Sequence, residues 1–73
     1  LQLYPNPVKD MLFLKSGSEI RKVAIYSSTG SKVYEKNLND RELHISVNDM
    51  TSGKYILKIY NAHGVICRNV VVL

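Results

Sequence analysis

The side chains of this 73-residue chain that are best suited to catalysis or metal binding are one cysteine and two histidines, Cys67, His44 and His63. Nucleophilic catalysis needs a nucleophile, a base beside it and a third group that orients the base. Alternation puts His44 on an outward strand position, and His63 falls in a turn between two strands. Cys67 lies in an apolar terminal strand, which predicts a buried thiol that packs as a small hydrophobe. The chain is therefore predicted not to be an enzyme.

The counts and positions of the cysteine, histidine, acidic and glycine residues argue against metal binding, cofactor binding and acid–base catalysis. A single cysteine excludes an intramolecular disulfide, and with two histidines it falls short of a tetrahedral metal site. The six acidic residues mostly flank expected strands and turns, where carboxylates are ordinarily solvated. The four glycines are isolated, so no glycine-rich phosphate loop exists. We expect neither a metal nor a cofactor.

The net charge is +4, from ten Lys and Arg against six Asp and Glu. These charges are scattered singly, which favours a role in solubility over a nucleic-acid site. A weak nucleic-acid pattern exists where Tyr34 lies between Lys32 and Lys36, and where Tyr60 follows Lys58. No apolar run approaches the roughly 20 residues that a membrane-spanning helix needs. We expect no nucleic-acid partner and no membrane span.

Period-two alternation dominates the sequence, and helical periodicity is absent. The clearest segment places Leu43, Ile45 and Val47 on one face, with Glu42 and His44 on the other. Turn signals recur about every ten residues, which is typical of a sandwich or barrel. We expect a single all-β domain, a seven-stranded antiparallel immunoglobulin-like β-sandwich, with strands at residues 1–4, 11–14, 21–27, 32–38, 42–47, 54–61 and 65–73.

Two backbone motifs stand out. In Tyr4-Pro5-Asn6-Pro7, each proline fixes its own φ and extends the residue before it, so the segment forms a stiff elbow after the first strand. The second motif is Asp49-Met50-Thr51-Ser52-Gly53-Lys54-Tyr55, which we expect to be a crossover between strands. In it, Asp49 is expected to close an Asx-type turn and Met50 to fill the end of the core. Gly53 is expected to supply a positive φ before the strand resumes at Tyr55. Such a crossover suits a connection between two sheets.

Together these features resemble the C-terminal sorting domain of the type IX secretion system of Bacteroidetes, the Por secretion tail, type A. The resemblance covers nearly the whole chain. It rests on Tyr4–Asp10 leading to Leu12, on Ile25-Tyr26 with Gly30, on Met50-x-x-Gly53-x-Tyr55, and on Gly64 before a closing apolar strand. The residues expected to serve recognition or the fold are Tyr4, Pro5, Asn6, Pro7, Asp10, Gly30, Gly53, Tyr55, Gly64 and Arg68.

The resemblance implies a non-catalytic tag, residues 1–73, at the C-terminal end of a longer secreted protein. Its partners would be the outer-membrane type IX machinery, a surface sortase and an N-terminal cargo domain of the same polypeptide. Its route would run through the periplasm to the cell surface, with cleavage and exchange for a lipopolysaccharide anchor. Arg68-Asn69 stands where the family commonly has a basic pair. The final strand and the elbow are the expected recognition surfaces, because strand edges accept partner strands.

The main alternative is an accessory immunoglobulin-like module that binds carbohydrate or protein on an extracellular enzyme. That function predicts an exposed aromatic platform with Tyr26, Tyr34 and Tyr60 grouped on one face. A third possibility is a basic nucleic-acid binder, whose affinity would fall steeply with salt.

Overall fold

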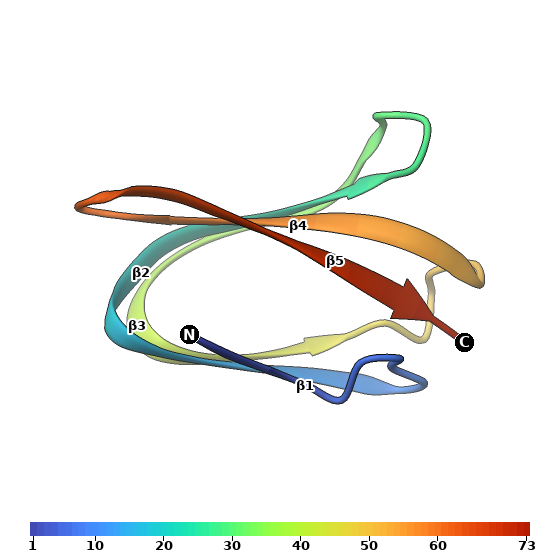
Figure 1. The fold of residues 1–73 in the computed structure, drawn as a ribbon, viewed down its shortest axis with the longest axis horizontal. Helices are drawn as coiled ribbons and strands as arrows, with labels where there is room; N and C mark the ends of the chain where they lie inside the picture. The colour runs from blue at the N-terminus through green and yellow to red at the C-terminus, as the bar shows by residue number, and fades with distance from the viewer.

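The computed structural model describes all residues 1–73 and contains five antiparallel strands in one sheet, with no helix (Figure 1). β2 lies at the centre and pairs with β1, β3 and β4, while β5 lies outside β4. No segment has the helical length and hydrophobicity of a membrane span. The strands are β1 (Gln2–Tyr4), β2 (Met11–Ser27), β3 (Lys32–Ser46), β4 (Gly53–Asn61) and β5 (Gly64–Val72).

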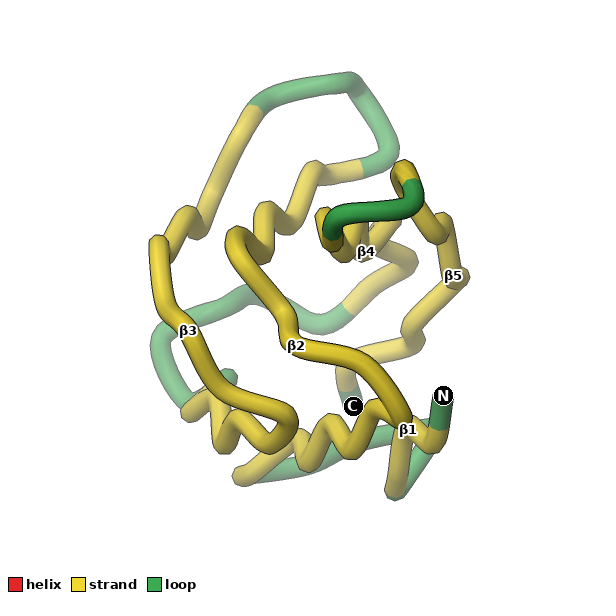
Figure 2. The backbone as a smooth tube through the Cα atoms, turned by 90° about the vertical axis from the view of Figure 1, so that its left-hand side faces the viewer, coloured by secondary structure: helices red, strands yellow, loops and turns green.

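The architecture follows from one long hairpin, β2–β3, that bends in its middle. Residues 11–15 of β2 pair with β1 on one side and with residues 42–46 of β3 on the other; we call this part the small half-sheet. Residues 20–27 of β2 pair with residues 32–40 of β3 and with β4, and with β5 they make the large half-sheet. In Figures 1 and 2, β2 and β3 curve together from one half-sheet to the other, so the halves face each other.

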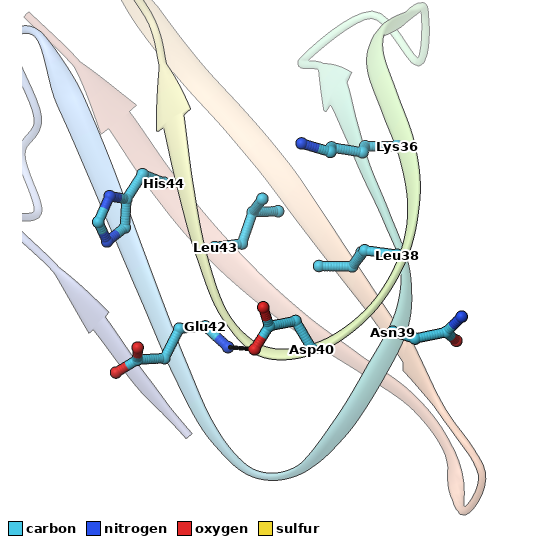
Figure 3. A pocket seen from close by; sticks show the side chains of 7 residues that line it. All are labelled: Lys36, Leu38, Asn39, Asp40, Glu42, Leu43 and His44. Atoms are coloured by element: carbon cyan, nitrogen blue, oxygen red, sulfur yellow. Dashed lines mark hydrogen bonds between the residues drawn. The ribbon is translucent and has the colours of Figure 1, made fainter.

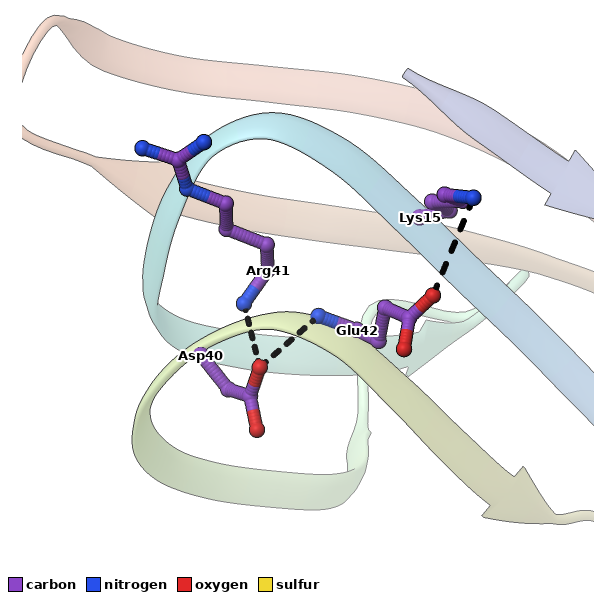
Figure 4. Close-up of polar contacts among 4 residues, drawn as sticks. All are labelled: Lys15, Asp40, Arg41 and Glu42. Carbon is purple, nitrogen blue, oxygen red and sulfur yellow. Dashed lines mark hydrogen bonds and ion pairs between the residues drawn. The ribbon is translucent and has the colours of Figure 1, made fainter.

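The bend forms where side chains replace ladder hydrogen bonds. In β2, the Ser18 N–H donates to the Ser16 hydroxyl at 3.2 Å. In β3, one carboxylate oxygen of Asp40 accepts from the backbone N–H of Arg41 at 2.7 Å and of Glu42 at 3.3 Å (Figure 4). The register shifts at this point. Unequal residue numbers in paired strands bend and twist a sheet.

The hydrophobic core fills the space between the facing half-sheets. Alternation along β4 buries Tyr55, Leu57 and Ile59, while Ile56 and Lys58 point outward, as the sequence predicts. Leu43, Ile45 and Val47 are buried as expected. The core comprises Val8, Leu12, Leu14, Ile20, Val23, Ile25, Leu43, Ile45, Val47, Tyr55, Leu57, Ile59, Val70 and Val72.

The expected count of seven strands is wrong, although each expected segment lies in extended chain. Residues 11–14 and 21–27 are two parts of β2, and residues 32–38 and 42–46 are two parts of β3. The Ser- and Gly-containing stretch at 15–18 is a bend within a strand and does not end it. The structure thus has one bent sheet in place of two open sheets, and the immunoglobulin-like grouping stays a prediction. The first and last strands are edges, as expected.

Truncating Leu57 should destabilise the domain strongly. Leu57 is fully buried at the centre of β4, and Leu→Ala changes at such sites cost about 2–5 kcal/mol. The neighbouring Ile56 points outward, so Ile56→Ala should cost much less. Urea denaturation followed by circular dichroism measures both free energies of unfolding. Equal losses for the two variants would contradict the described core.

Candidate functional site: the elbow and the final strand

The elbow between β1 and β2 turns the side chain of Asn6 toward β5. Asn6 Nδ2 donates to the Asn69 carbonyl at 2.9 Å, and Asn6 Oδ1 accepts from the Val71 N–H at 3.0 Å. A primary amide carries a donor and an acceptor side by side, as a peptide group does. Asn6 therefore pairs with the edge of β5 as a strand residue would, but through its side chain.

Val8 continues this pairing through its backbone. The Val8 N–H donates to the Val71 carbonyl at 2.8 Å, and the Leu73 N–H donates to the Val8 carbonyl at 2.9 Å. Val8 thereby makes a parallel bridge with Val72, and its side chain is fully buried. We call these contacts of Asn6 and Val8 with residues 69–73 the elbow clasp.

The elbow clasp joins the two half-sheets. The elbow connects β1 to β2 in the small half-sheet, whereas β5 is the outer strand of the large half-sheet. In Figure 1 the blue elbow lies beside the red end of β5. The clasp therefore closes the side of the bent sheet opposite β3, where the chain would otherwise present a free edge. This gives the Pro-flanked asparagine a structural role beyond a rigid turn.

The turn that leads into β4 lies at the same end of the molecule. Gly53 has a φ of 153°, a conformation that favours glycine, as expected. The buried Tyr55 donates its hydroxyl to the Thr51 carbonyl at 2.6 Å, which pins the crossover against the core. Met50 packs against the core, as predicted. The carboxylate of Asp49 makes no hydrogen bond, so the expected Asx-type turn is wrong; a backbone bond closes this turn, donated by the Met50 N–H.

Cross-strand pairing brings the two motifs together. Gly53 pairs with Val72, and Tyr55 pairs with Val70, so the start of β4 lies beside the end of β5. The elbow holds the other edge of the same stretch of β5. Segments near residues 6, 54 and 71 thus meet at one corner of the domain.

The two hairpin glycines lie at different ends of the large half-sheet. Gly30, with a φ of 90°, closes the β2–β3 turn by donating its N–H to the Ser27 carbonyl at 2.9 Å. Because Ser27 pairs with Tyr55, this turn lies near the start of β4. Gly64 pairs with Asn61 across the β4–β5 hairpin, at the far end. The structure therefore does not bring Gly64 to the clasp.

The remaining elbow residues face solvent. Tyr4 is half exposed and stacks on Phe13 with ring centroids 5.5 Å apart. The Asp10 backbone carbonyl accepts from the Val47 N–H at 2.9 Å, while its side chain is exposed and makes no hydrogen bond. Pro5 is also exposed. These residues position the start of β2 and form no pocket of their own.

The free edge of β5 is shorter than the sequence suggests. Residues 69, 71 and 73 direct backbone groups toward the clasp, and hydrogen-bonding direction alternates along an antiparallel strand. The backbone N–H and C=O groups of Val65 and Cys67 therefore point in the same direction, but these residues lie beyond the reach of the elbow. The guanidinium of Arg68 donates to the Cys67 carbonyl at 3.0 Å, which occupies part of this remaining edge.

The prediction of a buried Cys67 is wrong, because its thiol is exposed. Cys67 pairs with Lys58, which points outward, so strand parity places it on the outer face of the large half-sheet. His44 lies on the outer face of the small half-sheet, with its ring edge-on to Phe13 at 4.7 Å. His63 is at the β4–β5 hairpin tip, as expected. No cysteine–histidine pair forms, and no group of three His, Cys, Asp or Glu side chains is placed to hold a metal ion.

A groove of about 490 Å³ lies along the bend of β3 (Figure 3). Its two carboxylates are already engaged: Asp40 accepts from backbone N–H groups, and Glu42 lies 3.9 Å from Lys15 (Figure 4). Paired carboxylates free for acid–base work are therefore not found here. The lining residues are Lys36, Leu38, Asn39, Asp40, Glu42, Leu43 and His44.

The three tyrosines of the alternative binding platform are only partly grouped. Tyr26 and Tyr60 both point outward from the large half-sheet. Tyr34 packs against the core on the other side of the sheet, and its burial raises the pKa of its hydroxyl. The structure thus brings two of the three tyrosines to one face.

Sequence reasoning missed Val8 as a member of the clasp and missed the partners of Asn6, which are Asn69 and Val71. An asparagine between two prolines was the only local signal, because the flanking prolines lack N–H groups and leave the side-chain amide to make the contact. The partner strand lies more than 60 residues away, so no local pattern reveals the pairing.

Substituting Asn6 should weaken the clasp. Asn6→Ala removes two hydrogen bonds, for a loss of about 1–3 kcal/mol in the free energy of unfolding, and exposes the Val71 amide to exchange. Asn6→Asp keeps the acceptor for Val71 but loses the donor to Asn69, so Val71 should stay protected. Urea denaturation and amide hydrogen exchange measure these effects. Asn48→Ala, at an exposed asparagine with no hydrogen bond, is the control; unchanged Val71 exchange in Asn6→Ala would contradict the clasp.

Comparison with known proteins identifies a family for the chain. No curated protein and no solved structure matches the chain. The family model described as the secretion system C-terminal sorting domain matches residues 2–73, which span the elbow, the Gly53–Tyr55 turn and the final strand. The chain therefore belongs to the family of type IX secretion C-terminal sorting domains.

Proposed function

We propose that this domain is a folded, non-catalytic export signal that outer-membrane type IX machinery recognises on a longer cargo protein. Family membership makes the chain a C-terminal sorting signal for the type IX system and implies export to the cell surface or beyond. We further propose that the protein passes through the periplasm, that a surface sortase removes the domain and that the cargo receives a lipopolysaccharide anchor. The proposed source is a member of the Bacteroidetes.

The elbow clasp is the observation that supports recognition of a folded domain. Asn6, in the opening motif, holds the last strand, and Gly53 and Tyr55, in the second motif, pair with that same strand. The residues that resemble the family pattern therefore include those that complete the fold. We infer that the motifs act by building the shape that the machinery reads, rather than as a linear peptide.

The alternative of an accessory binding module has less support. Its aromatic platform would need three exposed tyrosines on one face, whereas Tyr34 packs against the core. The two that do share a face each have a lysine ammonium over the ring, which leaves less of the ring free for sugar stacking. Export therefore remains the proposed function.

Fusion of residues 1–73 to the C-terminus of a periplasmic reporter should direct it to the cell surface or medium. The host must carry a type IX system, and a matched strain without it serves as the control. Reporter activity and immunoblots of periplasm, surface and medium measure the exported fraction. Retention of the native fusion in the periplasm would contradict the proposed function.

A core variant tests whether the domain must be folded to act as an export signal. Leu57→Ala leaves the surface motifs unchanged but removes core packing, so its fusion should be exported less in proportion to its loss of folded population. Full export of a fusion shown to be unfolded would indicate a linear signal instead.

A further inference from the structure

The outer face of the large half-sheet gathers lysines that are scattered in the sequence. On β2, Lys22 and Tyr26 point away from the buried Val23 and Ile25. Lys32 pairs with Tyr26, so β3 adds a lysine to this face. On β4 the alternation with buried residues directs the remaining members outward. We call this surface the lysine–tyrosine face; it comprises Lys22, Tyr26, Lys32, Lys54, Lys58 and Tyr60.

This face carries most of the net charge of the chain. Its four lysines are offset by a single acidic residue, Glu35, so it holds three of the four net positive charges. The outer face of the small half-sheet is neutral by comparison, because its Lys15 lies 3.9 Å from Glu42. The domain therefore presents one basic and one neutral outer face, a difference that the scattered charges in the sequence conceal.

Two of the four lysines on this face lie over tyrosine rings. The Lys22 ammonium lies 4.8 Å from the centroid of the Tyr60 ring, and the Lys58 ammonium lies 5.0 Å from that of Tyr26. Ala24 lies between these residues on the outward side and is nevertheless fully buried. Cation–π contacts order lysine side chains, which lowers the entropic cost of binding through them.

Two of the lysines have no acidic partner. Lys22 lies 3.8 Å from Glu35 and Lys32 makes an ion pair with the same carboxylate, whose pKa is held below its usual range by the hydrogen bond from Lys32 and by the charge of Lys22. Neither Lys54 nor Lys58 forms an ion pair. The unneutralised charge is thus concentrated on β4.

Apolar side chains lie among these charges. Ile56 stands between Lys54 and Lys58 on β4 and is 40% exposed, and Val65, opposite Tyr60 on β5, is 51% exposed. Tyrosines and apolar side chains are typical of the core of a protein–protein interface, and charged residues are typical of its rim. A polyanion would use the charges but would gain little from the exposed Ile56 and Val65, which apolar side chains of a protein partner can cover.

We propose that the lysine–tyrosine face docks an acidic surface of a folded partner protein, with carboxylates opposite Lys54 and Lys58 and apolar side chains opposite Ile56. The inference rests on the proposed function, in which this partner belongs to the export machinery. Complementary charge at such a face raises the association rate and suppresses wrong partners. The elbow clasp then maintains the fold, while recognition occurs on the opposite side of β4 and β5 from the core.

Charge reversal on the face tests the proposal in the reporter fusion. The double variant K54E/K58E brings the net charge of the domain from +4 to zero. The exported fraction should fall about tenfold or more, because like charges then face the partner. K54R/K58R keeps both charges and should export as the native fusion does.

The matched control is K15E/R41E, which makes the same change in net charge on exposed residues away from the face. Its exported fraction should stay close to native. K54Q/K58Q, which keeps much of both stems, should lie between native and K54E/K58E. Urea denaturation of each purified domain checks that the free energy of unfolding is retained.

The outcomes separate the two proposals. Export of K54E/K58E at the level of K15E/R41E, with the native fusion exported, overturns the docking face and leaves the proposed function standing. Failure of the native fusion overturns both. Binding to vesicles of phosphatidylcholine and phosphatidylglycerol that vanishes in K54E/K58E, while export persists, would indicate a membrane surface and also overturn the protein partner.

Discussion

The domain depends on one pairing, in which the side-chain amide of Asn6 takes the place of a peptide group beside the final strand. The bent β2–β3 hairpin brings two half-sheets face to face with the core between them, but it joins their backbones only along β2 and β3. Asn6 and Val8 close the side away from β3 by binding the edge of β5. A chain this short has a thin core, and this closure supplies constraint that small domains otherwise obtain from disulfides or metals.

The same closure organises the surfaces. Once the half-sheets face each other, the apolar side chains that point inward form the core, and each half-sheet keeps one outer face. The small half-sheet presents the row Tyr4, Phe13 and His44, which are aligned by cross-strand pairing. The large half-sheet presents lysines and tyrosines. Because the two outer faces carry different side chains, a partner protein can distinguish them and bind the domain in a single orientation.

Local periodicity predicted much of the fold, because strands of period two reveal their buried side wherever one face is apolar. This holds for Leu43–Val47 and for Tyr55–Ile59. The bends at residues 15–18 and 39–41 carry the same Ser, Gly and Asp signals as turns, so the strand count came out as seven. The apolar neighbours of Cys67 predict burial, but alternation along β5 places its side chain on the outer face. The clasp and the lysine–tyrosine face depend on register between distant strands, which local sequence does not encode.

The elbow clasp also ties the fold to the order in which the chain is made. The two hydrogen bonds of Asn6 join residues that are 63 and 65 positions apart in the sequence. Contacts of such high sequence separation slow folding, since a long loop must close before they contribute. The ribosome releases the final strand last, so the corner formed by the elbow, Gly53–Tyr55 and β5 is completed only after residue 71 has emerged. A chain that ends before residue 71 therefore lacks the hydrogen bond from Val71 to Asn6, even though β1 to β4 are complete.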